Sequence, residues 1–454
     1  MRPEVKTVTD YLDSDYRDYA KYVVEERAIP SVIDGFKPTQ RKIIFVANKV
    51  WRNGSEKPLK IFQLAGKVAS DAHYHHGDGS LNGAIVTMAQ KFKNSMPVLD
   101  SIGQFGSLRS PEAGAPRYIS TKLHQNFRLL YKDFELLESR YEEGNEIEPN
   151  YFLPIIPTVL LNGGSGIAVG FATNILNRNP LTLVDACLKK LNGGTFQDPT
   201  PWYLEFNGEC IQNPESHLSW TFRGKYEIKN TSTVRILELP PSVTYEKFDQ
   251  HLINIEDKRN IAAYENNCKS NIDYTLKFRR EDLKTIKDSA KLERLIKMEE
   301  RQTENFTVLD ENGKLKIFTS AKEIIEYFVD FRLTYYLKRK RYIINRLESE
   351  LLFLSNRARF IKAIIDEELL VNNVPKSQIL LYLKTADFDE VDDSYSYLLN
   401  MPIHTLTFEK FQELLSQVEN RQLELTDIKK IEPIDMYKSD LLELKKALSK
   451  TFTS

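Results

Sequence analysis

Two stretches of heptad-spaced apolar residues near the end of the chain constrain its fold more than any other feature. They run over residues 344–365 and 408–425, with apolar residues at steps of three and four that Gln422 interrupts in the second stretch. The members are Ile344, Leu347, Leu351, Leu354, Ala358, Ile361 and Ile365, then Phe408, Phe411, Leu415, Val418 and Leu425. Such steps place the apolar side chains in one seam along a helix, which a second helix covers. Residues 366–407 separate the two stretches, so we predict an antiparallel coiled-coil hairpin. The core face of a helical bundle would give each stretch the same pattern.

The segment between the two helices ends in SYSYLLNMPIHTLT, residues 394–407. Its aromatic and apolar residues are Tyr395, Tyr397, Leu398, Leu399 and Met401. We expect them to be exposed at the tip of the hairpin, where they could serve self-association.

The composition is that of an ordinary globular protein of several domains. The chain has 454 residues, of which 41% are hydrophobic and 28% charged. Its beginning has no apolar signal region, and no stretch approaches the length of a membrane span. The three cysteines, Cys187, Cys210 and Cys268, are widely spaced and follow neither a zinc nor a disulfide pattern. We therefore expect a protein of a reducing compartment.

Positive charge is concentrated in the first third of the chain. The formal net charge is −1, but residues 17–132 hold 18 Lys and Arg against 9 Asp and Glu. A basic block in a neutral chain favours a surface that faces a polyanion, with nucleic acid the expected partner. Solvated basic residues without a partner are the alternative.

The same third predicts helices separated by short turns. Apolar residues at helical spacing follow Ser14, a possible N-cap, and the turn IDGFKP leads to a helix capped by Thr39. Two further helices flank HYHHGDGS, residues 73–80. This order suits a helix-turn-helix or winged-helix domain. From Asn150 the chain predicts buried strands joined by a Gly turn, and Asn312-Gly313 predicts a hairpin, so the middle third is α+β.

The segment QFGSLRSPEAGAPRYIS, residues 104–120, predicts a loop because Gly, Ser, Pro and Ala dominate it. The small residues lead up to the pair Arg117–Tyr118. A phenol beside a guanidinium is a candidate nucleophile for phosphorus, although these residues by themselves favour an ordinary surface tyrosine. The adjacent His75 and His76 point different ways, so joint metal chelation is disfavoured and contact with a phosphate is credible. No GxxxxGK[ST] or HExxH motif predicts a nucleotide or metal site in this chain.

Several motifs together resemble the breakage-reunion region of type IIA DNA topoisomerases. They are DGFKPTQRK, YHHGDGSLNGAI, IGQFGS, APRYIS and PIIPTVLLNGGSGIAVG, in that order, and the likeness covers nearly the whole chain. The residues of these motifs resemble the eukaryotic enzymes more closely than bacterial gyrase. From the length of the chain we expect neither their ATPase and Toprim domains nor the DNA-wrapping domain of the gyrase A protein. The chain therefore resembles the separate medium subunit found in T4-like phages.

The resemblance implies an α+β multidomain fold. We expect a winged-helix DNA-gate (breakage) domain over residues 1–150 and an α/β tower (shoulder) domain over residues 151–325. A long antiparallel coiled coil with a C-terminal dimer gate would occupy residues 326–454.

The resemblance also assigns roles to single residues. Tyr118 would attack the DNA phosphate and stay joined to the 5′ end, while Arg117, Arg27 and His76 would neutralise charge on the phosphate oxygens. The implied DNA contacts are Lys37, Arg41, Lys42, His75, Gln104 and Ile167. Ile167 matches an intercalating isoleucine, although the sequence alone favours a buried strand residue. Gly79 and Ser80 fall where drugs bind relatives, and the glycine departs from the family pattern.

The function implied is that of the DNA cleavage and religation subunit of an ATP-dependent type II topoisomerase, an isomerase. Its partners would be double-stranded DNA, a second copy through the C-terminal gate, and a large subunit holding Mg²⁺ and ATP, in an A2B2-like heterotetramer. We expect no membrane contact and a location in the cytoplasm, that of the host for a phage protein. One alternative is a non-catalytic DNA-binding coiled-coil dimer scaffold. A tyrosine recombinase or type IB enzyme is disfavoured because its tyrosine comes late in the chain, after an Arg…His-x-x-Arg pattern.

Overall fold

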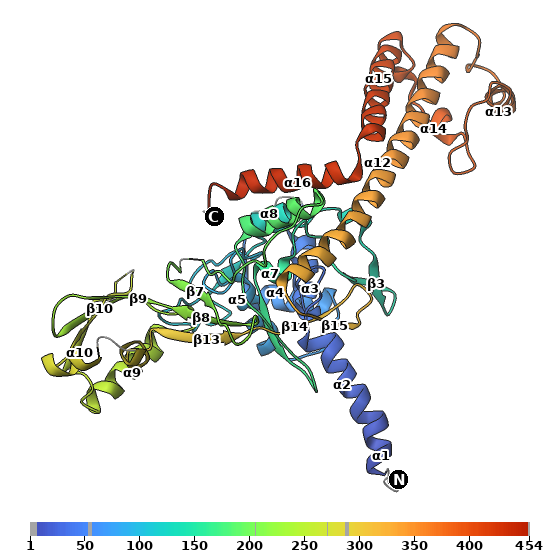
Figure 1. Ribbon diagram of the computed structural model, residues 1–454. Coiled ribbons are helices and arrows are strands. Elements are labelled where there is room, and N and C mark those ends of the chain that lie inside the picture. Colours follow the sequence, from blue (N-terminus) through green and yellow to red (C-terminus); the bar gives the residue numbers. More distant parts are fainter. Residues whose placement is uncertain (1–6, 53–56, 205, 270, 287–289, 453–454) are drawn as a thin grey trace. The chain divides into compact units, whose positions relative to one another are not determined.

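The computed structural model describes residues 7–52, 57–204, 206–269, 271–286 and 290–452 (Figure 1). The chain forms two compact units. The first comprises Met1–Arg332 together with Asp440–Ser454, and the second comprises Leu333–Ser439. Small antiparallel sheets and many helices make up the described part, which confirms the predicted α+β fold class. The proposed division of the first unit near residue 150 stays a prediction. None of the described helices is long and apolar enough to cross a membrane.

The first helices start earlier than predicted. Helix α1 (Val8–Tyr11) is capped by Thr7, whose hydroxyl oxygen accepts a hydrogen bond from the backbone N–H of Asp10 at 3.1 Å. Two π-helical segments, η1 (Leu12–Tyr16) and η2 (Val24–Ala28), flank α2 (Arg17–Val23). Ser14 lies inside η1, so its prediction as the N-cap was wrong. The hydroxyl of Ser14 instead donates to the carbonyl oxygen of Asp10.

Three helices form the body of the basic region: α3 (Pro38–Val50), α4 (Ile61–Asp71) and α5 (Asp78–Ala89). Thr39 does not cap α3, because Pro38 already occupies the first helical position and Lys37 is the N-cap. The Gln40 side chain accepts a hydrogen bond from the backbone N–H of Lys37 at 2.9 Å. Strand β1 (Leu59–Lys60) precedes α4 and pairs antiparallel with β2 (Ser120–Thr121). The start of α4 is therefore joined to the segment that follows Tyr118.

Hairpins and short helices surround these helices in the first unit. The elements are β3 (Ser139–Glu142), β4 (Asn145–Pro149), α6 (Gln125–Leu130), α7 (Thr158–Leu161), β5 (Gly164–Ile167), β6 (Ala172–Ile175) and α8 (Pro180–Leu191). The predicted Gly-turn hairpin is β5–β6. The preceding TVLL segment, expected as a strand, is helix α7, and all four of its residues are buried. The predicted Asn312-Gly313 hairpin is confirmed as β14 (Phe306–Leu309) paired with β15 (Leu315–Phe318).

Two antiparallel sheets form most of the middle third. One has the order β13-β8-β7, from β7 (Glu209–Gln212), β8 (Ser219–Arg223) and β13 (Glu299–Thr303). The other has the order β11-β12-β10-β9, from β9 (Lys225–Ile228), β10 (Thr233–Glu238), β11 (Ala263–Asn266) and β12 (Tyr274–Lys277). Helices α9 (Tyr245–Asp257), α10 (Arg280–Ile286) and α11 (Ala290–Leu295) contribute Phe248, Leu252, Leu283 and Leu292 to the core beneath the second sheet.

A buried ion pair joins the segment after β6 to the segment between β13 and β14. Arg178 and Glu304 are both buried, and a guanidinium nitrogen of Arg178 lies 2.8 Å from a carboxylate oxygen of Glu304. Glu304 also accepts hydrogen bonds from the Trp220 indole at 2.9 Å and from the backbone N–H of Leu176 at 3.0 Å. Every charge of the pair is thus compensated, as a buried pair requires.

The second unit is built on the antiparallel pairing of α12 (Ala321–Ile365) with α15 (Phe408–Lys430), which confirms the predicted helical hairpin. Leu347 and Leu351 pack on Leu425, while Ala358 and Ile361 pack on Leu414. The register of the second stretch differs from the prediction at two places. Leu414 is buried in the seam, whereas Leu415 and Phe408 are exposed.

The segment between α12 and α15 has a small core of its own. It contains α13 (Lys376–Thr385), α14 (Ser396–Leu399) and η4 (Ile403–Thr405). Tyr395 and Leu398, expected to be exposed, are buried there with Leu383. They cannot serve self-association in this conformation, because the segment needs them for its own packing. Ile403, Leu370 and Leu381 are instead exposed apolar residues of this segment. Helix α16 (Pro433–Leu448) begins in the second unit, and its residues from Asp440 onward belong to the first unit.

Candidate active site

Tyr118 projects from the turn before β2. Its side chain is 70% exposed, and the Arg117 guanidinium carbon lies 5.2 Å from the centre of its ring. The backbone of Tyr118 is held on both sides: its N–H donates to Ala115 at 2.8 Å, and its carbonyl oxygen accepts from the Lys60 ammonium at 2.8 Å. These contacts engage the ring and the backbone of Tyr118. They therefore leave the exposed phenol oxygen accessible to an external group.

The loop that carries Tyr118 closes on itself. The N–H of Gly114 donates to the carbonyl oxygen of Gln104 at 2.8 Å, and buried Ile119 anchors the end of the loop. Gly106 has a φ of +81°, and a Cβ there would collide with the backbone of Pro111, so a glycine is required. The glycine thus lets two backbone segments of the loop lie close together, and this closed loop presents Tyr118.

His76 lies in the turn between α4 and α5. Its Nε2 is 2.8 Å from the hydroxyl oxygen of Tyr22 on α2, and its ring meets that of Tyr74 edge-on at 5.4 Å. Arg27 is exposed at the end of η2. Within the part of the chain that the structure describes, no hydrogen bond or ion pair links the Arg117 and Tyr118 side chains to Arg27 or His76. Their joint role in chemistry stays a prediction.

Two of the predicted DNA contacts face inward. Arg41 is 5% exposed, and its guanidinium donates to both carboxylate oxygens of buried Asp34, at 2.7 and 3.1 Å. The ammonium of Lys42 donates to Glu148 at 2.9 Å and to the carbonyl oxygen of Ala72 at 2.6 Å. In this conformation the charges of Arg41 and Lys42 compensate buried carboxylates, and the role of both residues as DNA contacts stays a prediction.

Lys37 supports the β5–β6 hairpin. Its ammonium donates to the carbonyl oxygen of Ser165 at 2.8 Å, and burial lowers the pKa of Lys37. Ile167, at the end of β5, is 87% exposed, which overturns the alternative of a buried strand residue. Gln104 is also exposed, as a DNA contact would require.

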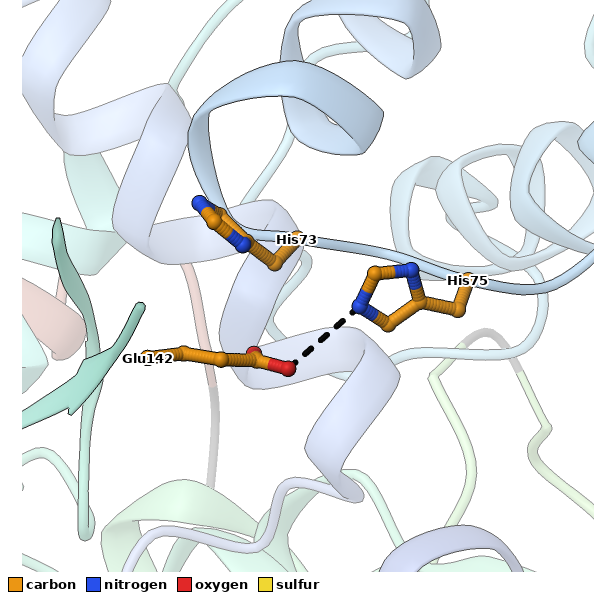
Figure 2. A group of neighbouring side chains, drawn as sticks. All are labelled: His73, His75 and Glu142. Carbon is orange, nitrogen blue, oxygen red and sulfur yellow. Dashed lines mark hydrogen bonds and ion pairs between the residues drawn. The ribbon is translucent and has the colours of Figure 1, made fainter. Parts of the chain in front are cut away.

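The two adjacent histidines diverge, as predicted. His76 turns to Tyr22, whereas the Nε2 of His75 lies 3.4 Å from a carboxylate oxygen of Glu142 (Figure 2). His73, to which the motifs assigned no role, joins the second pair, so that ligand atoms of His73, His75 and Glu142 all lie within 4.8 Å of one another. The HYH spacing could have indicated the two histidines. Glu142 and Tyr22 carry no sequence signal for their places, because each is more than fifty residues from its partner.

This cluster does not fit the Mg²⁺ that the family resemblance implies. Mg²⁺ prefers six oxygen ligands, whereas two of the three groups here are imidazoles. Among the described residues, no other set of three His, Cys, Asp or Glu side chains converges in this way.

Comparison with known proteins identifies the family. The family model for the A subunit of DNA gyrase/topoisomerase IV matches residues 27–443. The DNA topoisomerase medium subunit of Enterobacteria phage T4 is 32% identical over 452 residues, which cover 98% of this chain and 100% of that protein. DNA topoisomerase 2 of Arabidopsis thaliana is 34% identical over 477 residues, covering 94% of this chain but 32% of that enzyme.

A solved structure of similar fold points to the same family. The DNA-binding, cleavage and re-ligation domain of Plasmodium falciparum topoisomerase II matches with a TM-score of 0.86 and 31% identity, over 97% of this chain and 64% of that one. The chain therefore belongs to the family of the DNA gyrase/topoisomerase IV A subunit, within the type II DNA topoisomerases, which are isomerases. It spans about a third of the length of its eukaryotic relatives.

Proposed function

We propose that this chain cleaves and religates DNA as one subunit of an ATP-dependent type II topoisomerase. The observation that carries the proposal is the exposed phenol of Tyr118 beside the Arg117 guanidinium, on a loop closed by backbone hydrogen bonds. Membership of the family supports the same chemistry.

In the proposed reaction the phenol oxygen of Tyr118, having lost its proton, attacks a backbone phosphorus of DNA. The bond from phosphorus to the 3′ oxygen breaks, that oxygen takes up a proton, and the 5′ phosphate stays joined to Tyr118. One phosphate ester bond forms for each one broken, so religation by the reverse steps needs no ATP. Arg117, Arg27 and His76 would neutralise the charge that grows on the phosphate oxygens. The hydrogen bond between Tyr22 and His76 would hold that imidazole in place.

The rest of the assembly follows from the family. Two copies would each cut one strand, so that a second duplex passes through the break toward the gate formed by the C-terminal region. A large subunit would supply ATP and Mg²⁺ in an A2B2-like assembly, in the host cytoplasm if the protein belongs to a phage. The phage T4 relative, which matches this chain over its full length and is named as a medium subunit, supports the split design.

The Tyr118→Phe variant tests the nucleophile. We expect it to lose covalent protein–DNA adducts at 5′ ends, assayed with Mg²⁺ and the partner subunit, while DNA affinity stays within about twofold because one hydroxyl contributes little to a phosphate-dominated interface. Tyr141→Phe is the matched control, since Tyr141 is also 70% exposed. Adducts from the Tyr118 variant would show that another residue attacks. Absence of adducts even in the wild type would favour the DNA-binding scaffold.

Ile167→Ala tests the proposed intercalation of the Ile167 side chain into DNA. An exposed isoleucine at the end of a hairpin can enter a base step and bend the duplex. We expect the variant to reduce the bend angle measured by fluorescence energy transfer between labelled DNA ends. Ile403→Ala is the control, because Ile403 is 83% exposed in the second unit. If the Ile167→Ala and Ile403→Ala variants gave the same bend angle, Ile167 would not be the residue that bends the DNA.

A further inference from the structure

His73, His75 and Glu142 converge from two separate segments of the first unit. The two histidines lie in the turn between α4 and α5, and Glu142 ends β3 (Figure 2). Their ligand atoms lie within 4.8 Å of one another, and none of the three is buried. A metal ion from solution could therefore reach the cluster directly.

The backbone holds the two histidines on one side of the turn. Tyr74, between them, is buried, and its N–H donates to the carbonyl oxygen of Ala69 at 3.3 Å. The rings of His73 and His75 lie near each other, with their centroids 6.3 Å apart, while Tyr74 between them packs inward. His73 has a φ of +49°, a left-handed conformation that costs a non-glycine residue energy and that clusters at functional sites.

A tight turn sets the position of Glu142. Glu142 pairs with Asn145 across the β3–β4 hairpin, which leaves Glu143 and Gly144 as the two-residue loop. Both have positive φ, at +51° and +81°, as in a type I′ turn, whose twist suits paired strands. The carboxylate therefore stands at a fixed point beside the histidine turn.

The ligand set suits zinc. Two imidazoles and one carboxylate are a known ligand set for Zn²⁺, with the fourth position left for water. Ligand atoms about 2.0–2.1 Å from a tetrahedral ion lie roughly 3.4 Å apart, so the observed spread closes by small rotations of exposed side chains. The His75–Glu142 separation is 3.4 Å already.

The surroundings do not repel a cation. A cavity of about 270 Å³ beside the cluster is lined by the carboxylates of Glu26, Glu142 and Glu148 and by the cations of Lys42 and Arg140. Both cations contact Glu148, so their charges are partly compensated. With neutral histidines, the carboxylates outnumber the cations in this cavity.

We propose that His73, His75 and Glu142 bind one divalent transition-metal ion of the zinc class. The bound ion would tie the turn between α4 and α5 to strand β3 and so restrain Tyr74 and His76. The ligand set differs from the oxygen ligands that Mg²⁺ prefers, and the proposal does not rest on the proposed function.

Titration of the full chain with zinc chloride tests the site. The protein carries no polyhistidine tag, is stripped with a chelator, and is followed by calorimetry and by the visible absorption of Co²⁺ as a tetrahedral probe. We expect one equivalent to bind and to raise the thermal midpoint. His73→Asn and Glu142→Gln should each weaken binding at least about tenfold, because each removes a ligand. Asparagine also tolerates the left-handed conformation at position 73.

His404→Asn is the matched control, because it removes an exposed histidine far along the chain. It should bind zinc as the wild type does, and circular dichroism should show all variants folded. No stoichiometric binding to the wild type would overturn the proposal. So would wild-type affinity in either the His73 or the Glu142 variant, because the site requires all three ligands.

Discussion

Replacing Gly166 by alanine should displace the hairpin that carries Ile167. A Cβ at this position would meet the carbonyl group of Ala28, with the carbonyl carbon at 3.1 Å and the oxygen nearer still, and would stand 3.3 Å from the Lys37 ammonium. Ala28 closes η2 and its backbone cannot yield as a long side chain would. The β5–β6 hairpin must therefore move away from η2 by on the order of 1 Å, a case of overpacking.

The cost follows from the contacts involved. Overpacking costs about 1–3 kcal/mol. If the shift also breaks the hydrogen bond from Lys37 to Ser165, about 1 kcal/mol more is lost. Alanine recovers about 0.4–1 kcal/mol by restricting the unfolded chain. The net destabilisation should therefore be about 1–3 kcal/mol. The same shift moves Ile167, so DNA bending should fall as well.

Gly164→Ala is the control within the same strand. A Cβ at Gly164 meets nothing within 4 Å, so alanine there should be neutral or slightly stabilising. The assay is urea unfolding followed by circular dichroism, with wild type and both variants in parallel, and DNA bending as the second measurement. If Gly166→Ala unfolds at the same urea concentration as Gly164→Ala, the close approach of β5 to Ala28 is not a constraint and the reasoning fails.

Two further predictions concern charges inside the first unit. Glu304→Gln leaves the buried Arg178 guanidinium without its counter-charge and should cost about 3–5 kcal/mol in urea unfolding, whereas Glu209→Gln, at an exposed ion pair, should cost less than about 1 kcal/mol. Burial lowers the pKa of His124, whose Nδ1 accepts a hydrogen bond from Asn126 and caps α6. The unfolded chain then binds protons more readily, so this contribution to stability is present above the ordinary histidine pKa of about 6.5 and is lost as the pH falls below it. His124→Asn, which keeps a capping side chain, should flatten the fall in urea midpoint between about pH 7.5 and 5.5, and an unchanged slope would contradict the assignment.

Periodic features of the fold could be predicted from the sequence. The pairing of α12 with α15 follows from apolar steps of three and four, and the β14–β15 hairpin follows from Asn-Gly between two strands. Such patterns are local, so the chain displays them without reference to its tertiary structure. Such patterns do not fix every position. The prediction placed Leu415 in the seam, but Leu414 is buried there, because two adjacent leucines fit the same period and only packing decides between them.

Features that depend on distant partners could not be predicted. Lys42 reads as a surface cation on a basic helix, but its partner Glu148 lies 106 residues further along the chain. The motif identified Tyr118 and His76 from the family pattern, yet Tyr22, which holds the imidazole, belongs to no motif. Ile167 lay in an apolar run that favours burial, and only the hairpin geometry exposes it.

The return of α16 to the first unit has a consequence for synthesis of the protein. Lys132 pairs with Asp440 and Glu443 at 3.0 Å each, Asp185 with Lys445, and Trp202 packs on Phe452. The first unit is therefore discontinuous in sequence. As the chain leaves the ribosome, residues 1–332 emerge without these partners and wait for more than a hundred residues of the second unit to follow. Closure of the first unit therefore has to wait until the second unit has been synthesised, and a chain that stops before α16 leaves Lys132 without both of its carboxylates.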